Sequence, residues 1–178
     1  MHRPRHALFA ALPLLLVAGP LLAQDAPAPV AAEQPARAWP AAEWWGNANV
    51  GSRHFGDEDD YLAPGESFNE FNPGIGVEVQ WRPVHAMSAG YFRNSVDGNS
   101  LYLLYHFTPM PIGRYVRLGA IAGVVTGYPG YNDGGVGPAG GLIAKIEGER
   151  FGANLIFLPP LEDVTPATVG LQLKARFR

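Results

Sequence analysis

The chain has 178 residues, of which 47% are hydrophobic and only 16% are charged, with a formal net charge of -3 at pH 7. This length allows one domain, and the absence of cysteine excludes a disulfide scaffold, Cys-ligated zinc and thiol catalysis. The acidic balance argues against a nucleic-acid partner, the 22 Gly and 17 Pro disfavour a helical bundle, and the low charged fraction suits a chain that exposes apolar surface to lipid.

Residues 1–23 have the pattern of a secretory signal peptide. Arg3 and Arg5 precede an apolar run, and Ala23 offers a small-residue cleavage point. The alternative is a retained membrane anchor, but the run is short, is interrupted by proline and has no stop-transfer charges after it. We therefore expect cleavage and export.

Residues 24–43 are rich in Ala, Pro and Glu and have little to bury, so they predict a disordered linker. The folded domain is expected at residues 44–178. It begins with Trp44 and Trp45, which suit either a core or the headgroup boundary of a membrane.

Alternation of apolar and polar residues between Gly, Pro, Asn and Asp punctuation predicts strands and no helix in the folded domain. We expect eight strands, at residues 47–55, 74–81, 86–94, 100–107, 114–125, 139–147, 151–158 and 169–178. The last of these is the clearest, since every second residue from Val169 to Phe177 is apolar and the residues between them are Gly, Gln, Lys and Arg.

Eight tilted strands of about ten residues match an all-β, antiparallel, up-and-down transmembrane β-barrel of the bacterial outer membrane. The connections after odd strands are the longer ones, at 56–72, 95–99, 126–138 and 159–167. If both termini face the periplasm, these long connections face outward, as in such barrels.

Two strands, 114–125 and 151–158, are largely apolar on both faces. This argues against a soluble barrel or sandwich, which would turn polar residues outward. It predicts lipid outside the barrel and an oily, hydrocarbon-like well inside it.

One pair of side chains could support acyl transfer. His54 ends the first strand, while Asn94 and Ser95 end the third strand at the same rim. An imidazole beside a hydroxyl is the minimum for base-assisted acyl transfer, and an amide can donate to the developing oxyanion. The alternative is structural, because Ser and Asn are common where a strand becomes a loop.

The stretch from His54 to Phe177 resembles the PagP-type lipid A palmitoyltransferases, eight-stranded outer-membrane barrels. The resemblance consists of a rim His before a long loop, the Gly-rich start of the second strand at Gly74-Ile75-Gly76, and a third strand that ends in Phe92-Arg93-Asn94-Ser95. It implies an acyltransferase that moves a palmitoyl-like chain from a phospholipid donor to a lipid A acceptor. Asn94 departs from the family, which has Asp there.

The resemblance also implies roles for residues. His54 would be the general base and Ser95 the nucleophile or an essential polar partner. His106, with Tyr102, would lie in the acyl well, where His106 on its floor would shorten the accepted chain. Pro138 and Pro159 would loosen the strand pairing and open lateral routes for lipid. No cofactor and no metal is implied, and we expect a monomer in the outer membrane of a Gram-negative bacterium.

Other readings of the sequence remain open. A non-enzymatic small outer-membrane barrel for envelope integrity, adhesion or lipid binding is the main alternative, and a lipid A deacylase is a third, although its His-x-Ser motif is missing. The nearest match, His85-Ala86-Met87-Ser88, is expected at the periplasmic end. The acidic run 57–60 suits a solvated loop better than a divalent cation site, because no regular ligand spacing is present.

Overall fold

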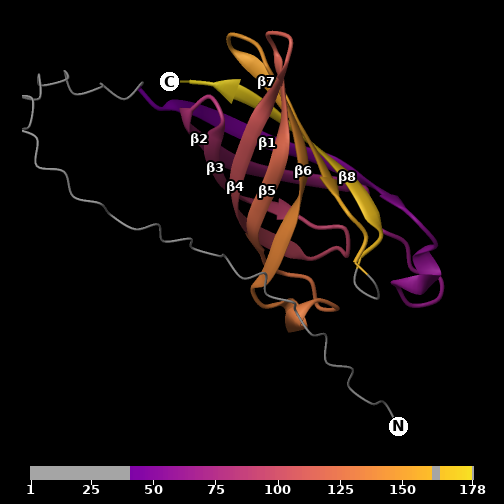
Figure 1. The fold of residues 1–178 in the computed structure, drawn as a ribbon. Coiled ribbons are helices and arrows are strands. Elements are labelled where there is room, and N and C mark those ends of the chain that lie inside the picture. The colour runs from indigo at the N-terminus through magenta and orange to yellow at the C-terminus, as the bar shows by residue number, and fades with distance from the viewer. Residues whose placement is uncertain (1–40, 162–164, 178) are drawn as a thin grey trace, which may run out of the picture. The chain divides into compact units, whose positions relative to one another are not determined.

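The computed structural model describes residues 41–161 and 165–177; the predicted signal peptide and almost all of the predicted linker lie outside the described residues. Eight strands form a closed antiparallel barrel in which each strand pairs with its neighbour in sequence and the last pairs with the first (Figure 1). The strands are β1 (Glu43–Phe55), β2 (Phe71–Arg82), β3 (His85–Arg93), β4 (Asn99–Ile112), β5 (Val116–Val125), β6 (Gly137–Glu147), β7 (Phe151–Leu158) and β8 (Ala167–Arg176). The predicted fold class is confirmed.

The two ends of the barrel differ in the length of their connections. Connections after β1, β3, β5 and β7 are long and gather at one end, which we call the loop end; they include the short 3-10 helices η1 (Glu58–Asp60) and η2 (Asn132–Gly134). Connections after β2, β4 and β6 are tight turns at the other end, called the turn end, near which β1 begins and β8 finishes (Figure 1). Within the described residues, no helix is long and apolar enough to cross a membrane.

Four strands are longer than the sequence predicts, and β4 and β1 extend furthest beyond their expected bounds. β4 runs on to Ile112 through Pro109 and Pro111, where we expected a turn. The pairing with β5 shifts register between Phe107 and Met110, so a bulge accommodates the first proline. β1 begins at Glu43 and includes both tryptophans, which divide between the two roles considered above: Trp45 is buried and Trp44 faces outward.

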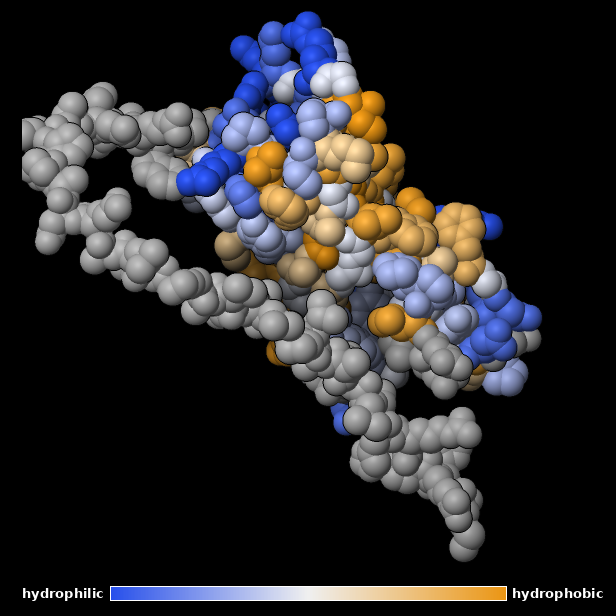
Figure 2. All heavy atoms as spheres, in the orientation of Figure 1, coloured by the Kyte–Doolittle hydropathy of each residue, from blue (hydrophilic) through white to orange (hydrophobic). Residues whose placement is uncertain are grey.

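Most apolar side chains face outward, and most buried inward side chains are polar. Along β4 the outward residues Leu101, Leu103, Tyr105 and Phe107 are exposed, while the inward Ser100, His106 and Thr108 are buried. In β8, Leu173 is half exposed, whereas Gln172 and Lys174 are buried. This inversion of the usual pattern confirms that the apolar face of the predicted alternation points away from the barrel interior. The space-filling view shows hydrophobic residues across much of the visible wall (Figure 2).

The interior is filled in two layers. Nearer the loop end, an apolar layer contains Tyr102, Leu104, Ile121 and Ile143, with five partly buried hydrophobic side chains packed against it. Nearer the turn end, most inward side chains are polar or charged and buried, beside the apolar Trp45 and Ala86. β5 and β7 are largely apolar on both faces, and their inward apolar residues therefore lie only in the layer nearer the loop end.

Glycines make room for the Tyr102 ring inside the barrel. A Cβ added at Gly76 would lie 2.3 Å from the Tyr102 hydroxyl oxygen, and one added at Gly90 would lie 2.6 Å from the same atom. Both glycines sit on inward positions of β2 and β3, opposite each other in the register. The Gly-rich start of β2 is thus explained by a close approach of an aromatic ring.

We predict that Gly90→Ala lowers the free energy of unfolding by about 1–3 kcal/mol, because the added methyl group overpacks against the Tyr102 ring and the Ile75 carbonyl. The matched control is Gly140→Ala, where the new Cβ would be 3.5 Å from the nearest atom, the Ile121 carbonyl oxygen. Urea midpoints of the detergent-folded proteins measure both changes. Equal midpoints for the two variants would contradict the packing role of Gly90.

Candidate functional site

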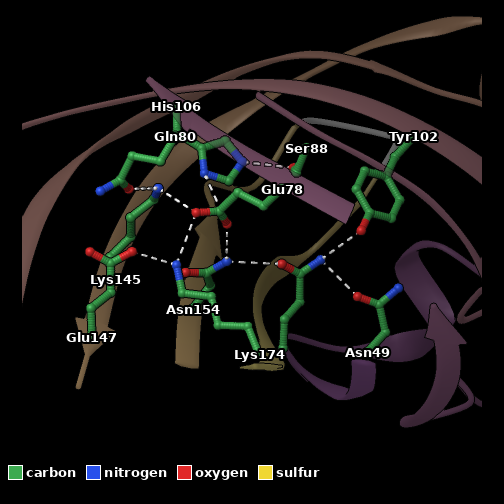
Figure 3. Close-up of polar contacts among 11 residues, drawn as sticks. Asn49, Glu78, Gln80, Ser88, Tyr102, His106, Lys145, Glu147, Asn154 and Lys174 are labelled. Carbon is green, nitrogen blue, oxygen red and sulfur yellow. Dashed lines mark hydrogen bonds and ion pairs between the residues drawn. The ribbon is translucent and has the colours of Figure 1, made fainter. Parts of the chain in front are cut away.

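A cluster of charged side chains lies inside the barrel at the turn-end layer, centred on Glu78 of β2 (Figure 3). Its Oε1 accepts hydrogen bonds from Lys145 Nζ at 2.7 Å and from Lys174 Nζ at 2.9 Å. Its Oε2 accepts one from Asn154 Nδ2 at 3.0 Å. These residues come from β2, β6, β7 and β8, and all four side chains are buried, so one carboxylate joins both halves of the barrel wall.

The charges of this ion cluster balance. Lys174 Nζ also donates to Glu147 Oε1 at 2.6 Å, and Lys145 Nζ also donates to Gln80 Oε1 at 3.1 Å. The two ammonium groups therefore face two carboxylates. Glu78, Lys145 and Lys174 are buried and Glu147 is partly buried. Such burial is tolerated only when each charge has a partner, because the desolvation cost of an unpaired ion is several kcal/mol.

Hydrogen bonds continue from the ion cluster towards the loop end. Asn154 Nδ2 donates to Gln172 Oε1 at 3.2 Å, and Gln172 Nε2 donates to Asn49 Oδ1 at 2.7 Å. Gln172 also reaches the Tyr102 hydroxyl at 3.4 Å (Figure 3). Polar contacts therefore link β7, β8 and β1 to the apolar layer, and they fix the strands relative to each other at both depths.

His106 is paired with Ser88, a contact that the sequence analysis missed. Ser88 Oγ and His106 Nε2 are 2.8 Å apart, and His106 Nδ1 is 3.8 Å from Glu78 Oε2. Ser, His and a carboxylate in this order resemble a nucleophile with its base. Both Ser88 and His106 are buried, however, and the carboxylate already binds two lysines. The geometry ties β2, β3 and β4 together and presents no nucleophile to a substrate.

The described interior is apolar in one layer only, so the predicted oily well does not extend through the whole barrel. His106 and Tyr102 do point inward, as predicted, but His106 lies in the ion cluster and Tyr102 packs over glycines within the apolar layer. The prediction failed because it extended the apolar character of β5 and β7 to the whole lumen. The signal that could have corrected it was present in the alternation itself, since Glu78, Gln80 and Lys174 share the polar faces of their strands.

His54 lies at the loop end on an inward position of β1, and is half buried. Its ring stacks on Phe68 of the first long connection, with ring centroids 4.2 Å apart. The Nδ1 atom is buried and has no hydrogen-bond partner within the described part of the chain. This imidazole interacts electrostatically with three charged side chains, those of Glu70, Glu58 and Arg53.

Asn94 and Ser95 directly follow β3 at the same end of the barrel, as predicted. The Asn94 Oδ1 accepts from the backbone N–H groups of Val96 and Gly98, and its Nδ2 donates to Ser100 Oγ at 2.9 Å and to the Gly127 carbonyl at 2.7 Å. The amide therefore organises the loop after β3 and holds it to the next long connection.

Ser95 contacts other loop residues. Its carbonyl accepts from the Asn69 backbone N–H at 2.8 Å. Burial raises the pKa of the Tyr128 phenol, and hydrogen bonding from Ser95 opposes this shift. At the loop end, His54 thus stacks on Phe68, whereas Ser95 hydrogen-bonds with Asn69 and Tyr128.

The environment of Asn94 explains why Asp does not occupy this position. A carboxylate could still accept from Val96 and Gly98, but it could not donate to the Gly127 carbonyl. We predict that Asn94→Asp lowers the free energy of unfolding by about 1–3 kcal/mol, because a buried carbonyl loses its donor and faces a negative charge. Faster proteolysis in residues 94–98 and 126–136 would report the loosened loops. Unchanged cleavage would contradict this role.

The resemblance gives Pro138 and Pro159 a role in opening lateral routes for lipid, and both lie at the loop end. The β5–β6 and β6–β7 pairings beside them differ in length. Pairing of β5 with β6 continues through Pro138, which is opposite Val124. Pairing of β6 with β7 stops at Leu142 opposite Phe157, two residues before Pro159, so this seam has six register pairs against ten for β5 with β6.

The acidic run in the first long connection makes local contacts. Glu58 Oε1 accepts from the Phe68 backbone N–H at 3.3 Å. In residues 41–161 and 165–177, no group of three or more His, Cys, Asp or Glu side chains is arranged to hold a metal ion.

The fold and the site together define the class of protein: a small closed barrel with an apolar exterior and an interior filled by packed hydrophobic side chains and a charge-balanced ion cluster. No family model matches the chain, and no curated protein matches it. Among solved structures, the N-terminal β-barrel domain of Pseudomonas aeruginosa OprF is similar, with 20% sequence identity and a TM-score of 0.44; the match covers 76% of this chain and 97% of that one.

Proposed function

We propose that the protein is an integral outer-membrane barrel that supports the envelope, with a sealed interior and no catalytic role. One observation carries this proposal: exposed apolar residues cover the outside while a charge-balanced ion cluster is buried inside. In water this arrangement would be unfavourable twice over, because apolar surface would be hydrated and charged groups would be desolvated. In a bilayer the exterior is matched to its solvent.

Aromatic residues at both ends of the barrel support this proposal. Exposed aromatic side chains at the turn end are Trp44, Tyr115, Phe151 and Phe177, and those towards the loop end are Phe55, Phe71 and Tyr91. Aromatic rings favour the boundary between hydrocarbon and headgroups. The two sets are therefore positioned to mark the two membrane surfaces.

The filled interior favours a structural role over transport. A conducting barrel needs a water-filled lumen, whereas in this barrel Glu78, Lys145 and His106 are buried and bonded across the lumen at the turn-end layer. The functional surfaces that remain are the lipid-facing wall and the long connections.

The test is expression of the full chain in a Gram-negative host, followed by membrane separation and electrophoresis with and without heating. We expect the protein in the outer-membrane fraction, resistant to extraction by carbonate, with a mobility that changes on heating. A protein released by carbonate, or one that stays in solution without detergent, would overturn the proposal.

A second candidate is lipid A acyltransferase activity, with a phospholipid as donor. It is favoured by the common location of His54, Asn94 and Ser95 at the loop end. It is also favoured by the buried Nδ1 of His54, which has no hydrogen-bond partner among residues 41–161 and 165–177. The packed interior weighs against it, because an acyl chain held inside the barrel would have to displace the Tyr102 layer.

Mass spectrometry of lipid A separates the two candidates. Under the structural proposal, cells with and without the protein have the same lipid A species. A gain of one acyl chain that is lost in His54→Ala and Ser95→Ala, with heat-modifiable barrel retained, would establish the acyltransferase instead.

A further inference from the structure

An apolar groove of about 620 Å³ runs over the outside of the barrel across β4 to β7. Its floor contains small residues, Ala120 and Ala144, and its sides are built by larger exposed side chains such as Phe107, Met110 and Leu142. Both alanines alternate with buried residues of β5 and β6, so their methyl groups face outward. The groove is therefore a hollow in the surface that the proposed function assigns to lipid.

A bulge shapes the turn-end side of this groove. Thr108 and Pro109 of β4 lie opposite a single residue, Gly119 of β5, because the register passes from Phe107–Ala120 to Met110–Leu118. A Cβ at Gly119 would lie 1.9 Å from the Phe107 carbonyl oxygen, so no larger residue fits there. The floor of the hollow is thus fixed by backbone geometry and small residues, while its sides are exposed side chains.

Basic residues lie beyond the groove at the turn end. The tips of the β4–β5 and β6–β7 hairpins lie at the top of Figure 1, and Figure 2 shows a hydrophilic tip with a hydrophobic face below it. These turns carry Arg114 and Arg150, both exposed, and the Arg114 guanidinium lies 4.6 Å from the Tyr115 ring centroid. A ligand with an apolar chain and an anionic head would match these two adjacent surfaces, the apolar groove and the basic turn end.

The charge distribution of the described segments distinguishes between two anionic lipids. The connections 56–70, 94–98 and 126–136 carry eight Asp and Glu, while the strand ends beside them carry Arg53 and Arg93. The turn end and its flanking strand ends carry five Arg against three Glu: Arg82, Arg114, Arg117, Arg150 and Arg176, and Glu43, Glu147 and Glu149. Lipid A phosphates would meet the acidic end, whereas a phospholipid of the opposite leaflet would meet the basic end.

We propose that this groove binds one acyl chain of an anionic phospholipid whose phosphate is held at the turn end by Arg114. The inference rests on the proposed membrane location. The site combines an apolar groove that has a fixed floor of small residues with a cation beyond it. It therefore selects a lipid by its headgroup charge and accepts the acyl chain by fit.

The test is native mass spectrometry of the purified full barrel in detergent, after addition of dioleoyl phosphatidylglycerol, dioleoyl phosphatidylethanolamine or lipid A. We expect one phosphatidylglycerol retained per barrel, in preference to the other two lipids. Ala144→Leu fills the groove and should lower retention. Arg114→Gln removes the cation and should lower retention about fivefold, the effect of losing one cation at a lipid surface.

Matched controls separate the site from general lipid adhesion. Ala122→Leu changes an outward residue of β5 outside the groove, and Arg93→Gln removes a cation at the loop end, so both should retain phosphatidylglycerol as the parent does. Equal retention of all three lipids, preference for lipid A, or no effect of Ala144→Leu and Arg114→Gln would overturn the inference. Heat-modifiable mobility of each variant shows whether the barrel is inserted, so loss of lipid selectivity in a folded barrel leaves the proposed function standing.

Discussion

Replacement of Glu78 by Gln is expected to lower the free energy of unfolding by about 3–5 kcal/mol, the cost of leaving a buried charge without its partner. Glu78 bonds both Lys145 and Lys174, and the removal of its charge leaves two ammonium groups facing only Glu147. Urea titration of the protein in lipid vesicles, followed by tryptophan fluorescence, measures the change.

The control for this prediction restores the charge balance. In Glu78→Gln with Lys145→Met, one positive and one negative group are removed together, so we expect recovery of a substantial part of the lost stability and a favourable coupling energy between the two sites. A single Glu78→Gln variant within about 1 kcal/mol of the parent would show that the ion cluster adds little to stability.

Leu103→Arg is expected to destabilise the inserted barrel by about 2–4 kcal/mol, the cost of an arginine on the lipid face near the bilayer centre. Leu103 is half exposed, faces outward, and pairs with Ala89, the central residue of β3. The same substitution on a water-exposed wall would be close to neutral. The result therefore distinguishes a membrane barrel from a soluble one.

Phe71→Arg is the depth control for Leu103→Arg. Phe71 is the first residue of β2 at the loop end and is two-thirds exposed, so an arginine there reaches the headgroup region at a cost of about 0–1 kcal/mol. Urea titration in vesicles measures both variants. Equal effects at the two depths would contradict the assignment of the apolar wall to lipid.

The strands and their order could be predicted because alternation is a local signal. None of the apolar residues of β2, β4 and β8 on the alternating outward face is buried, and the division into long and short connections holds around the whole barrel. The main exception was β4 beyond Phe107, which contains Pro109 and Pro111. Prolines are tolerated there because the strand has a bulge and then ends at the hairpin turn.

The candidate site could be predicted only in part. The position of His54, Asn94 and Ser95 at one rim follows from strand parity, but their contacts depend on how three long connections pack, which no local pattern encodes. The ion cluster unites Glu78 with residues 67 and 96 positions away, so its pairing depends on register around the closed barrel. The Asn94 amide also donates two hydrogen bonds, which a carboxylate could not do, and these contacts are visible only in three dimensions.

The pairing of β1 with β8 has a consequence for biogenesis. Ten register pairs join the first strand to the last, and the Lys174 that completes the ion cluster lies in that last strand. A chain whose last strand has not yet been made thus keeps two open sheet edges, and its Glu78 lacks one of its two ammonium partners. Closure must wait for the final residues, so both edges stay open to pairing with another chain until β8 has been made.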